Sequence, residues 1–194
     1  MSHSCGGKDL KKMTPVETLK AEHRVIERVL DAVETMAAAP RIDEGFFKGA
    51  IDFLRNFADG CHHAKEEDIL FPELERAGVP REGGPIGCML HEHEQGRLLI
   101  RRMVESLDAA AEGSAVAVAA LRRAVAEYVS LLRQHIDKED NVLFVMAESA
   151  LHPERVEAMS AAFERVESEH AEPDRHERYL ALAEELTRRA ADRK

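Results

Sequence analysis

The sequence contains no tryptophan, and aromatic residues make up only 5% of its 194 positions. Aromatic and β-branched side chains are the residues that strands favour, whereas Ala, Leu, Glu and Arg, which are abundant here, favour helices. We therefore expect an all-α protein. Its length suits one domain, or one domain with a helical extension.

Basic residues are also scarce relative to acidic ones, 27 against 37, which gives a formal net charge of −10. Such a surface repels phosphate backbones and predicts no nucleic-acid partner. No apolar run approaches about 18 residues, and the N-terminus lacks a signal-peptide layout, so neither a membrane partner nor secretion is expected. Three scattered cysteines without a CxxC pair indicate reduced thiols. These features predict a cytoplasmic protein of unspecified oligomeric state.

Hydrophobic periodicity predicts four long amphipathic helices. Thr14-Pro15-Val16-Glu17 reads as a capping box at the start of the first helix, and the second begins near Asp43. Pro72 falls inside the second helix and is expected to kink or interrupt it. Pro85 opens the third helix, and a Gly113-Ser114 turn separates it from the fourth.

Short links between these helices predict an antiparallel up-down-up-down four-helix bundle over residues 14–150. Residues 1–13 read as a polar, disordered tail, and residues 151–194 as two further helices packed on the bundle. The second of these has a plausible capping box in Asp174 and Glu177. The histidines of this extension are interpreted as surface or capping residues: His152, His170 and His176.

A short motif occurs twice, beginning at His62 and at His135. The first copy reads HHAKEEDILF from His62, and the second reads HIDKEDNVLF from His135. Each places a Glu four residues after the His, which are Glu66 and Glu139, so both side chains share one helix face. A pair of metal ions bridged by carboxylates requires this spacing from two helices.

Each of the four predicted long helices carries one histidine in its apolar stripe, and two of them add the glutamates. The set is His23, His62, Glu66, His93, His135 and Glu139. Six such groups in a core would be costly to bury unpaired, and a metal centre removes that cost. Imidazole and carboxylate without thiolate suit iron or manganese, and also zinc. Two bridging carboxylates point to a dinuclear centre, with room for a bridging oxo or hydroxo group and for dioxygen, peroxide or nitric oxide.

Several assignments stay open. His63 with Glu67 has the same spacing as His62 with Glu66. The repeat favours His62 with Glu66, because Leu70-Phe71 and Leu143-Phe144 then lie at matching offsets. Glu27, one turn after His23, is a candidate proton donor or additional ligand. Helical spacing also places Ile69 and Val142 on the inner faces, whereas His91 is expected to be exposed. Cys61, Cys88 and Tyr128 are interpreted as core residues.

The chain resembles the hemerythrin-like (HHE cation-binding) family over residues 14 to about 150. The resemblance rests on four segments: Ala21–Ile26, the His62 block through Pro72, His91-Glu92-His93-Glu94 with Arg97, and the His135 block. It implies a bundle around a non-haem di-iron site, with two iron ions in an Fe–O–Fe type centre. It also implies that the terminal ligands are His23, His62, His93 and His135. The bridging ligands that it implies are Glu66 and Glu139.

The sequence departs from the oxygen-carrying members, which take two histidines from the third helix. Met89 and Arg97 occupy the positions one turn from His93, and the carboxylate of the fourth helix is Glu139 at +4 rather than Asp at +5. The pattern is closer to bacterial relatives associated with nitric oxide, oxidative stress and repair of iron centres. It is compatible with an enzyme that reduces peroxide or nitric oxide, with an iron-binding sensor or store, and with a metal-free bundle.

Overall fold

The computed structural model describes residues 13–169 and 175–193. These residues are helical apart from short turns and contain no strand, which confirms the all-α prediction. None of the described helices combines the length and apolar character needed to cross a membrane. The predicted tail up to residue 12, His170 and the cap at Asp174 lie outside the described residues.

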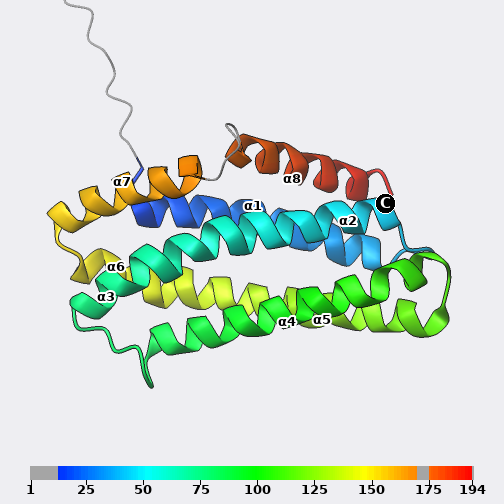
Figure 1. The fold of residues 1–194 in the computed structure, drawn as a ribbon, viewed down its shortest axis with the longest axis horizontal. Helices are drawn as coiled ribbons and strands as arrows, with labels where there is room; N and C mark the ends of the chain where they lie inside the picture. Colours follow the sequence, from blue (N-terminus) through cyan, green and yellow to red (C-terminus); the bar gives the residue numbers. More distant parts are fainter. Residues whose placement is uncertain (1–12, 170–174, 194) are drawn as a thin grey trace, which may run out of the picture.

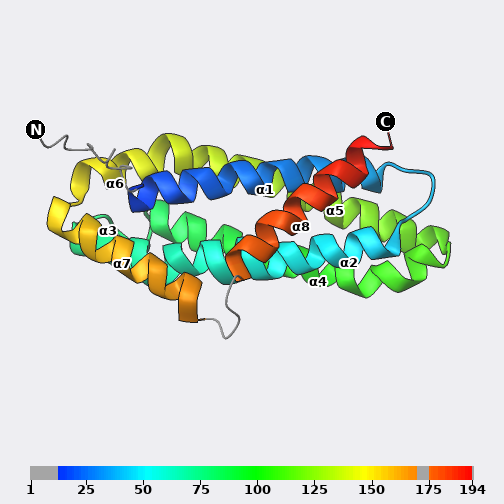
Figure 2. The same cartoon turned by 90° about the horizontal axis from the view of Figure 1, so that it is seen from above.

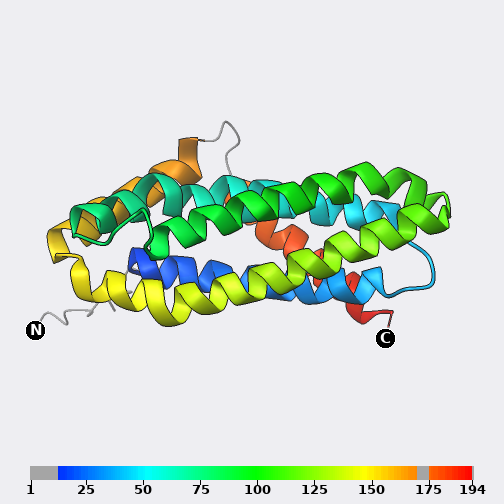
Figure 3. The same cartoon turned by 90° about the horizontal axis from the view of Figure 1, so that it is seen from below.

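Four long helical rods lie side by side and run in alternating directions (Figures 1 and 3). The first rod is α1 and the third is α4, which span Pro15–Ala37 and Pro85–Ala111. The second rod is built from α2 (Glu44–Phe53), η1 (Leu54–His63), η2 (Glu66–Leu70) and α3 (Phe71–Arg76). The fourth is built from α5 (Ala115–Lys138), η3 (Glu139–Leu143) and α6 (Phe144–Ala150).

The rods begin where the sequence predicts. Thr14 and Glu17 form the capping box of α1, and Asp43 caps α2 by accepting a hydrogen bond from Phe46 N–H. Pro85 opens α4. Gly113 adopts φ of 93°, a left-handed conformation that glycine tolerates, so the chain reverses there before α5.

Two buried apolar clusters fill the space between the rods, and a polar layer separates them. The larger cluster includes Phe46, Phe53 and Tyr128, and the smaller includes Leu70 and Phe144. Between them the buried residues are polar: Glu22, His23, His62, His63, Lys65, Glu66, His93, His135 and Glu139. This layer crosses all four rods at one level.

Both copies of the repeat contain a π-helical turn that begins at the glutamate, Glu66–Leu70 in η2 and Glu139–Leu143 in η3. A π turn inserts one residue into a helix and is frequent at functional sites. Because of this inserted residue, the inward-facing position in η3 lies one residue later than helical spacing predicts. Val142 is 51% exposed, whereas Leu143 is 1% exposed.

The π turn of η2 also explains why the helix is not interrupted at Pro72, where the sequence predicts an interruption. Phe71 N–H bonds to the carbonyl of Glu66, five residues back, and α3 continues directly to Arg76. Pro72 follows this wider turn at the start of α3, where a missing N–H is tolerated. The predicted interruption is therefore a change of helix type within a continuous rod.

Two more helices, α7 (Pro153–Glu169) and α8 (Arg175–Ala191), lie outside the rods. Figure 2 shows α8 crossing α1 and α2. Tyr179 packs edge-on to Phe53 at 6.4 Å between ring centroids. At the other end of α8, Arg189 donates to both carboxylate oxygens of Asp43 at 3.1 Å. Asp43 therefore caps α2 and anchors α8.

We expect Asp43→Ala to lower the free energy of unfolding by about 1 kcal/mol, a typical cost of losing an N-cap. Asp43→Asn should cost less, because its amide oxygen still accepts from Phe46. Burial opposes ionisation of Asp43, but the Phe46 N–H and Arg189 lower its pKa. The Asp43–Arg189 ion pair thus stabilises the folded protein at pH values above the ordinary carboxyl pKa. This stabilisation is lost as pH falls through the lower pKa that Asp43 has in the folded state.

Urea denaturation of both variants between pH 3 and 7 measures this. The exposed Asp52→Ala on the same helix is the control. Equal stability of the wild type and Asp43→Ala at pH 7 would contradict the anchoring role.

Candidate metal centre

The polar layer brings seven predicted or alternate ligand residues into two groups. One group is His23, His62, Glu66 and Glu139, and the other is His63, Glu66, His93 and His135. Within each group, one ligand atom per residue lies within 4.8 Å of all the others. Glu66 belongs to both groups and is the shared carboxylate.

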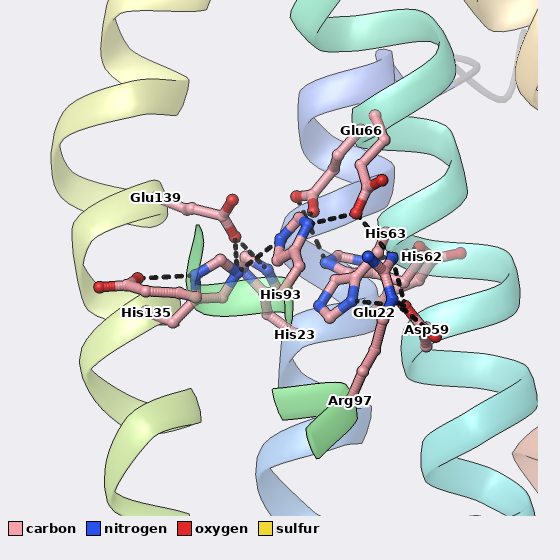
Figure 4. A network of polar contacts seen from close by, with 12 residues as sticks. Glu22, His23, Asp59, His62, His63, Glu66, His93, Arg97, His135 and Glu139 are labelled. Carbon is pink, nitrogen blue, oxygen red and sulfur yellow. Dashed lines mark hydrogen bonds and ion pairs between the residues drawn. The ribbon is translucent and has the colours of Figure 1, made fainter. Parts of the chain in front are cut away.

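The two glutamates lie between the groups. The two oxygens of Glu66 diverge, with Oε1 at 3.4 Å from His62 Nε2 and Oε2 at 3.5 Å from His93 Nε2. Glu139 Oε2 lies 3.3 Å from His23 Nε2 and 3.2 Å from His135 Nε2. Figure 4 shows these side chains converging from the four rods. Each carboxylate therefore reaches one histidine of each group, as a bridge between two ions would.

All five imidazoles are oriented by a carboxylate at Nδ1. The pairs and distances are His23–Asp140 (2.8 Å), His62–Glu22 (2.9 Å), His63–Asp59 (3.2 Å), His93–Glu67 (2.6 Å) and His135–Glu92 (3.0 Å). A neutral imidazole that donates from Nδ1 leaves Nε2 free as a ligand. Metal-binding histidines commonly have this carboxylate partner, which fixes ring orientation and raises ligand basicity.

Each orienting carboxylate is in turn held by a cation. Lys65 contacts Glu22, and Lys138 contacts Glu92. Arg24 pairs with Asp140. Arg97 bonds to both Asp59, at 2.9 Å from Nε, and Glu67, at 2.7 Å from Nη2. These contacts hold the outer carboxylates in place, so the orientation of every ring is set before any ion binds.

The contacts follow the internal repeat. Glu22-His23 on α1 corresponds to Glu92-His93 on α4, and each glutamate orients the histidine of a repeat copy. The residues that follow Glu66 and Glu139 make the reciprocal contacts: Glu67 orients His93, and Asp140 orients His23. The outer contacts of four histidines thus form two matching halves.

His63 has no counterpart, because Ile136 occupies the matching position of the second copy. Its ring stacks on His93 at 3.8 Å between centroids, and it is 5% exposed. The choice between His62 and His63 is therefore not exclusive, since both rings enter the centre. The ten-residue π-helix η1 ends on these residues and widens the turn, which lets consecutive side chains face inwards.

The titration behaviour reflects the buried carboxylates. Burial disfavours the charged form of His62, but Glu66 and Glu22 outweigh it and raise the pKa to about 10. For His135, Glu139 outweighs burial and also raises the pKa to about 10. Burial and the adjacent His93 lower the pKa of His63. The glutamates thus require positive charge beside them, and metal cations can replace the protons that supply it.

Several polar atoms at the centre are buried without a hydrogen-bond partner among the described residues. They are His23 Nε2, His62 Nε2, and both oxygens of Glu66 and of Glu139. In addition, His93 Nε2 and His135 Nε2 face each other at 3.2 Å. Buried polar groups are otherwise almost always paired. This donor set fits metal ions, which would satisfy the atoms that no protein group reaches.

Other predicted residues lie outside the two groups. Glu27 is partly exposed and pairs with Arg24 at 2.9 Å, so its position gives no support for a proton donor or ligand. Glu67 contacts His93 at Nδ1, on the outer side of the ring, instead of joining either ligand group. His91 is exposed, as expected. Helical spacing did not indicate roles for Glu22, Glu92, Asp59 and Asp140, although Glu-His occurs at both Glu22 and Glu92.

We expect Asp140→Ala to weaken metal binding by about 10–100-fold, because His23 loses the acceptor that orients it. Competition against a chelator of known affinity measures the change. Asp137→Ala is the matched control, since Asp137 is exposed on the same rod. Equal affinities of the two variants would contradict the orienting role of Asp140.

Comparison with known proteins agrees with this geometry. The family model described as the hemerythrin HHE cation binding domain matches residues 14–147. An uncharacterized protein of Mycobacterium tuberculosis is 28% identical over 172 residues, covering 86% of this chain and 63% of that protein. The chain therefore spans less than two thirds of that relative.

Two relatives are named iron-sulfur cluster repair protein YtfE. The protein from Edwardsiella ictaluri is 37% identical over 100 residues, covering 50% of this chain and 44% of that protein. The protein from Musicola paradisiaca is 36% identical over 90 residues, covering 44% and 40%. The family match covers more than half of the chain and includes every residue of the two ligand groups. The chain belongs to the hemerythrin HHE cation-binding family.

Proposed function

We propose that the chain is a non-haem di-iron protein that binds or reacts with dioxygen, nitric oxide or peroxide. The observation that carries the proposal is Glu66, whose two unpaired, buried oxygens each approach a histidine of a different group. A carboxylate in this position is suited to bridging two ions. The rods form the up-down-up-down bundle that supports such a centre.

The proposed ligands divide unequally between the ions. His63, His93 and His135 would hold one ion, and His23 and His62 the other, with Glu66 and Glu139 as bridges. Bound iron would supply reversible one-electron chemistry and an open coordination position for a small ligand. The two-histidine side has fewer protein donors, so we assign the exogenous ligand to that side.

Apolar rings shield the centre. Phe144 stacks on His23 with ring centroids 5.4 Å apart, and Phe71 stacks near His93 at 6.0 Å. Both rings are fully buried and occupy the same position of the repeat. They exclude water from the Nε2 faces, which strengthens electrostatic interactions there and suits small, weakly polar ligands.

A role in oxidative or nitrosative stress, or in iron handling, is consistent with the centre. The relatives named iron-sulfur cluster repair proteins support this role, although they match only about half of the chain. The outer cation–carboxylate pairs hold the rings in place for uptake and release of iron. A non-catalytic iron sensor or store would use the same ligands.

Metal content per chain after anaerobic purification from iron-supplemented cells tests the proposal. We expect about two irons per chain in the wild type and fewer in Glu66→Gln, which keeps the side-chain volume but loses the bridging charge. Asp68→Asn is the matched control, because Asp68 is exposed within the same π turn. Exposure to nitric oxide, peroxide or dioxygen should change the optical spectrum of the wild type. One zinc or no metal, or unchanged iron in Glu66→Gln, would contradict the proposal.

His63→Ala tests the unequal division of ligands. We expect one of the two irons to be lost to a chelator about tenfold faster or more, because one group loses an imidazole donor. Anaerobic release kinetics followed with a coloured ferrous chelator measure this. His91→Ala is the control, since His91 is exposed and its ring bonds to the side chain of Gln95, away from the centre. Identical release from the two variants would remove His63 from the ligand set.

A further inference from the structure

A third group of metal-ligating side chains lies outside the two groups of the centre. It consists of Glu22, Cys61 and His176, with one ligand atom of each within 4.8 Å of the other two. Cys61 is 7% exposed and is not disulfide-bonded to Cys88, the other cysteine among the described residues. The Nδ1 atom of His176 is buried and has no hydrogen-bond partner among the described residues. A buried nitrogen in this condition costs free energy unless a ligand satisfies it.

The first turn of α8 brings His176 to this position. Arg175 donates to the Asn56 side chain at 3.2 Å, and the His176 ring lies 5.4 Å from the Phe57 ring. Phe57 is one turn before Cys61 on η1, so His176 lies over the face that carries the thiol. His176, predicted as a surface or capping residue, is partly exposed, but its Nδ1 atom is buried.

The ring of His62 separates this group from the centre. Glu22 Oε2 lies 2.9 Å from His62 Nδ1, whereas His62 Nε2 faces Glu66. The two nitrogens are on opposite edges of an imidazole, so Glu22 is on the outer side. Cys61 directly precedes His62 in the sequence and is the only sulfur ligand among the three groups.

We propose that Glu22, Cys61 and His176 form a mononuclear site for a borderline divalent cation of the Zn²⁺, Co²⁺ or Fe²⁺ class. Thiolate and imidazole select such ions over Mg²⁺ or Ca²⁺. Three protein ligands leave a fourth position for water or an external ligand. On binding, a metal–sulfur bond forms and the Cys61 thiol proton passes to solvent.

The charge of the ligand set agrees with a divalent cation. Glu22 and the Cys61 thiolate supply two negative charges, and Lys65 offsets part of the charge of Glu22. The site shares Glu22 with the centre, since this carboxylate also orients His62, but no sulfur belongs to the other two groups. A metal–thiolate signal therefore reports this site whatever ion occupies the centre.

Cobalt titration of the full chain, loaded with iron and kept under nitrogen, tests the proposal. Cys5→Ser and Cys88→Ser are introduced first, so that Cys61 is the one remaining cysteine. We expect an absorption band from cobalt–thiolate charge transfer that saturates at about one Co²⁺ per chain. Adding Cys61→Ser should abolish the band, and His176→Ala should weaken cobalt binding about tenfold or more.

His152→Ala is the control for His176→Ala, since His152 is exposed in the C-terminal extension. Iron content and circular dichroism establish that each variant is folded, and His176→Ala decides the question if Cys61→Ser does not fold. No thiolate band in the parent protein would overturn the proposal. A band that survives Cys61→Ser, or an affinity unchanged by His176→Ala, would also overturn it.

Discussion

The interior of this protein depends on compensating a layer of ionisable groups within an otherwise apolar core. Glu66 and Glu139 are both fully buried, and neither pairs with a Lys or Arg in the described part of the chain. Their neighbours are imidazole nitrogens. Charges buried in this way are expensive unless paired, and protons or metal ions on the histidine side are the available compensation.

The outer layer of charge makes this arrangement possible. Arginine and lysine side chains hold the carboxylates that orient the imidazoles, and these cations lie farther from the centre. Arg97 serves two such carboxylates, Asp59 and Glu67, and thereby links η1, η2 and α4. Charge therefore alternates from the surface inwards, from cation to carboxylate to imidazole to bridging carboxylate. Two metal ions at the centre would complete that alternation.

Repetition and its one exception together shape the candidate chemistry. Two halves with matching contacts would give two equivalent ions, whereas His63 adds a third imidazole to one side. An unequal division leaves one ion with more open coordination than the other. Departure from symmetry, and not the repeat itself, is the feature that would direct a small ligand to one side.

The sequence by itself determined the helices, their caps, the repeat, and the candidate positions of four histidines and two glutamates. Those features depend on spacings of a few residues, which a helix of known period converts directly into faces. Only the tertiary structure decided that Leu143 replaces Val142 on the inner face, because a π turn cannot be read from periodicity. It also placed His63 beside His62 in the core, and joined His23 to Asp140 across 117 positions. Such contacts depend on how separate rods pack together, and local sequence spacing carries no record of that packing.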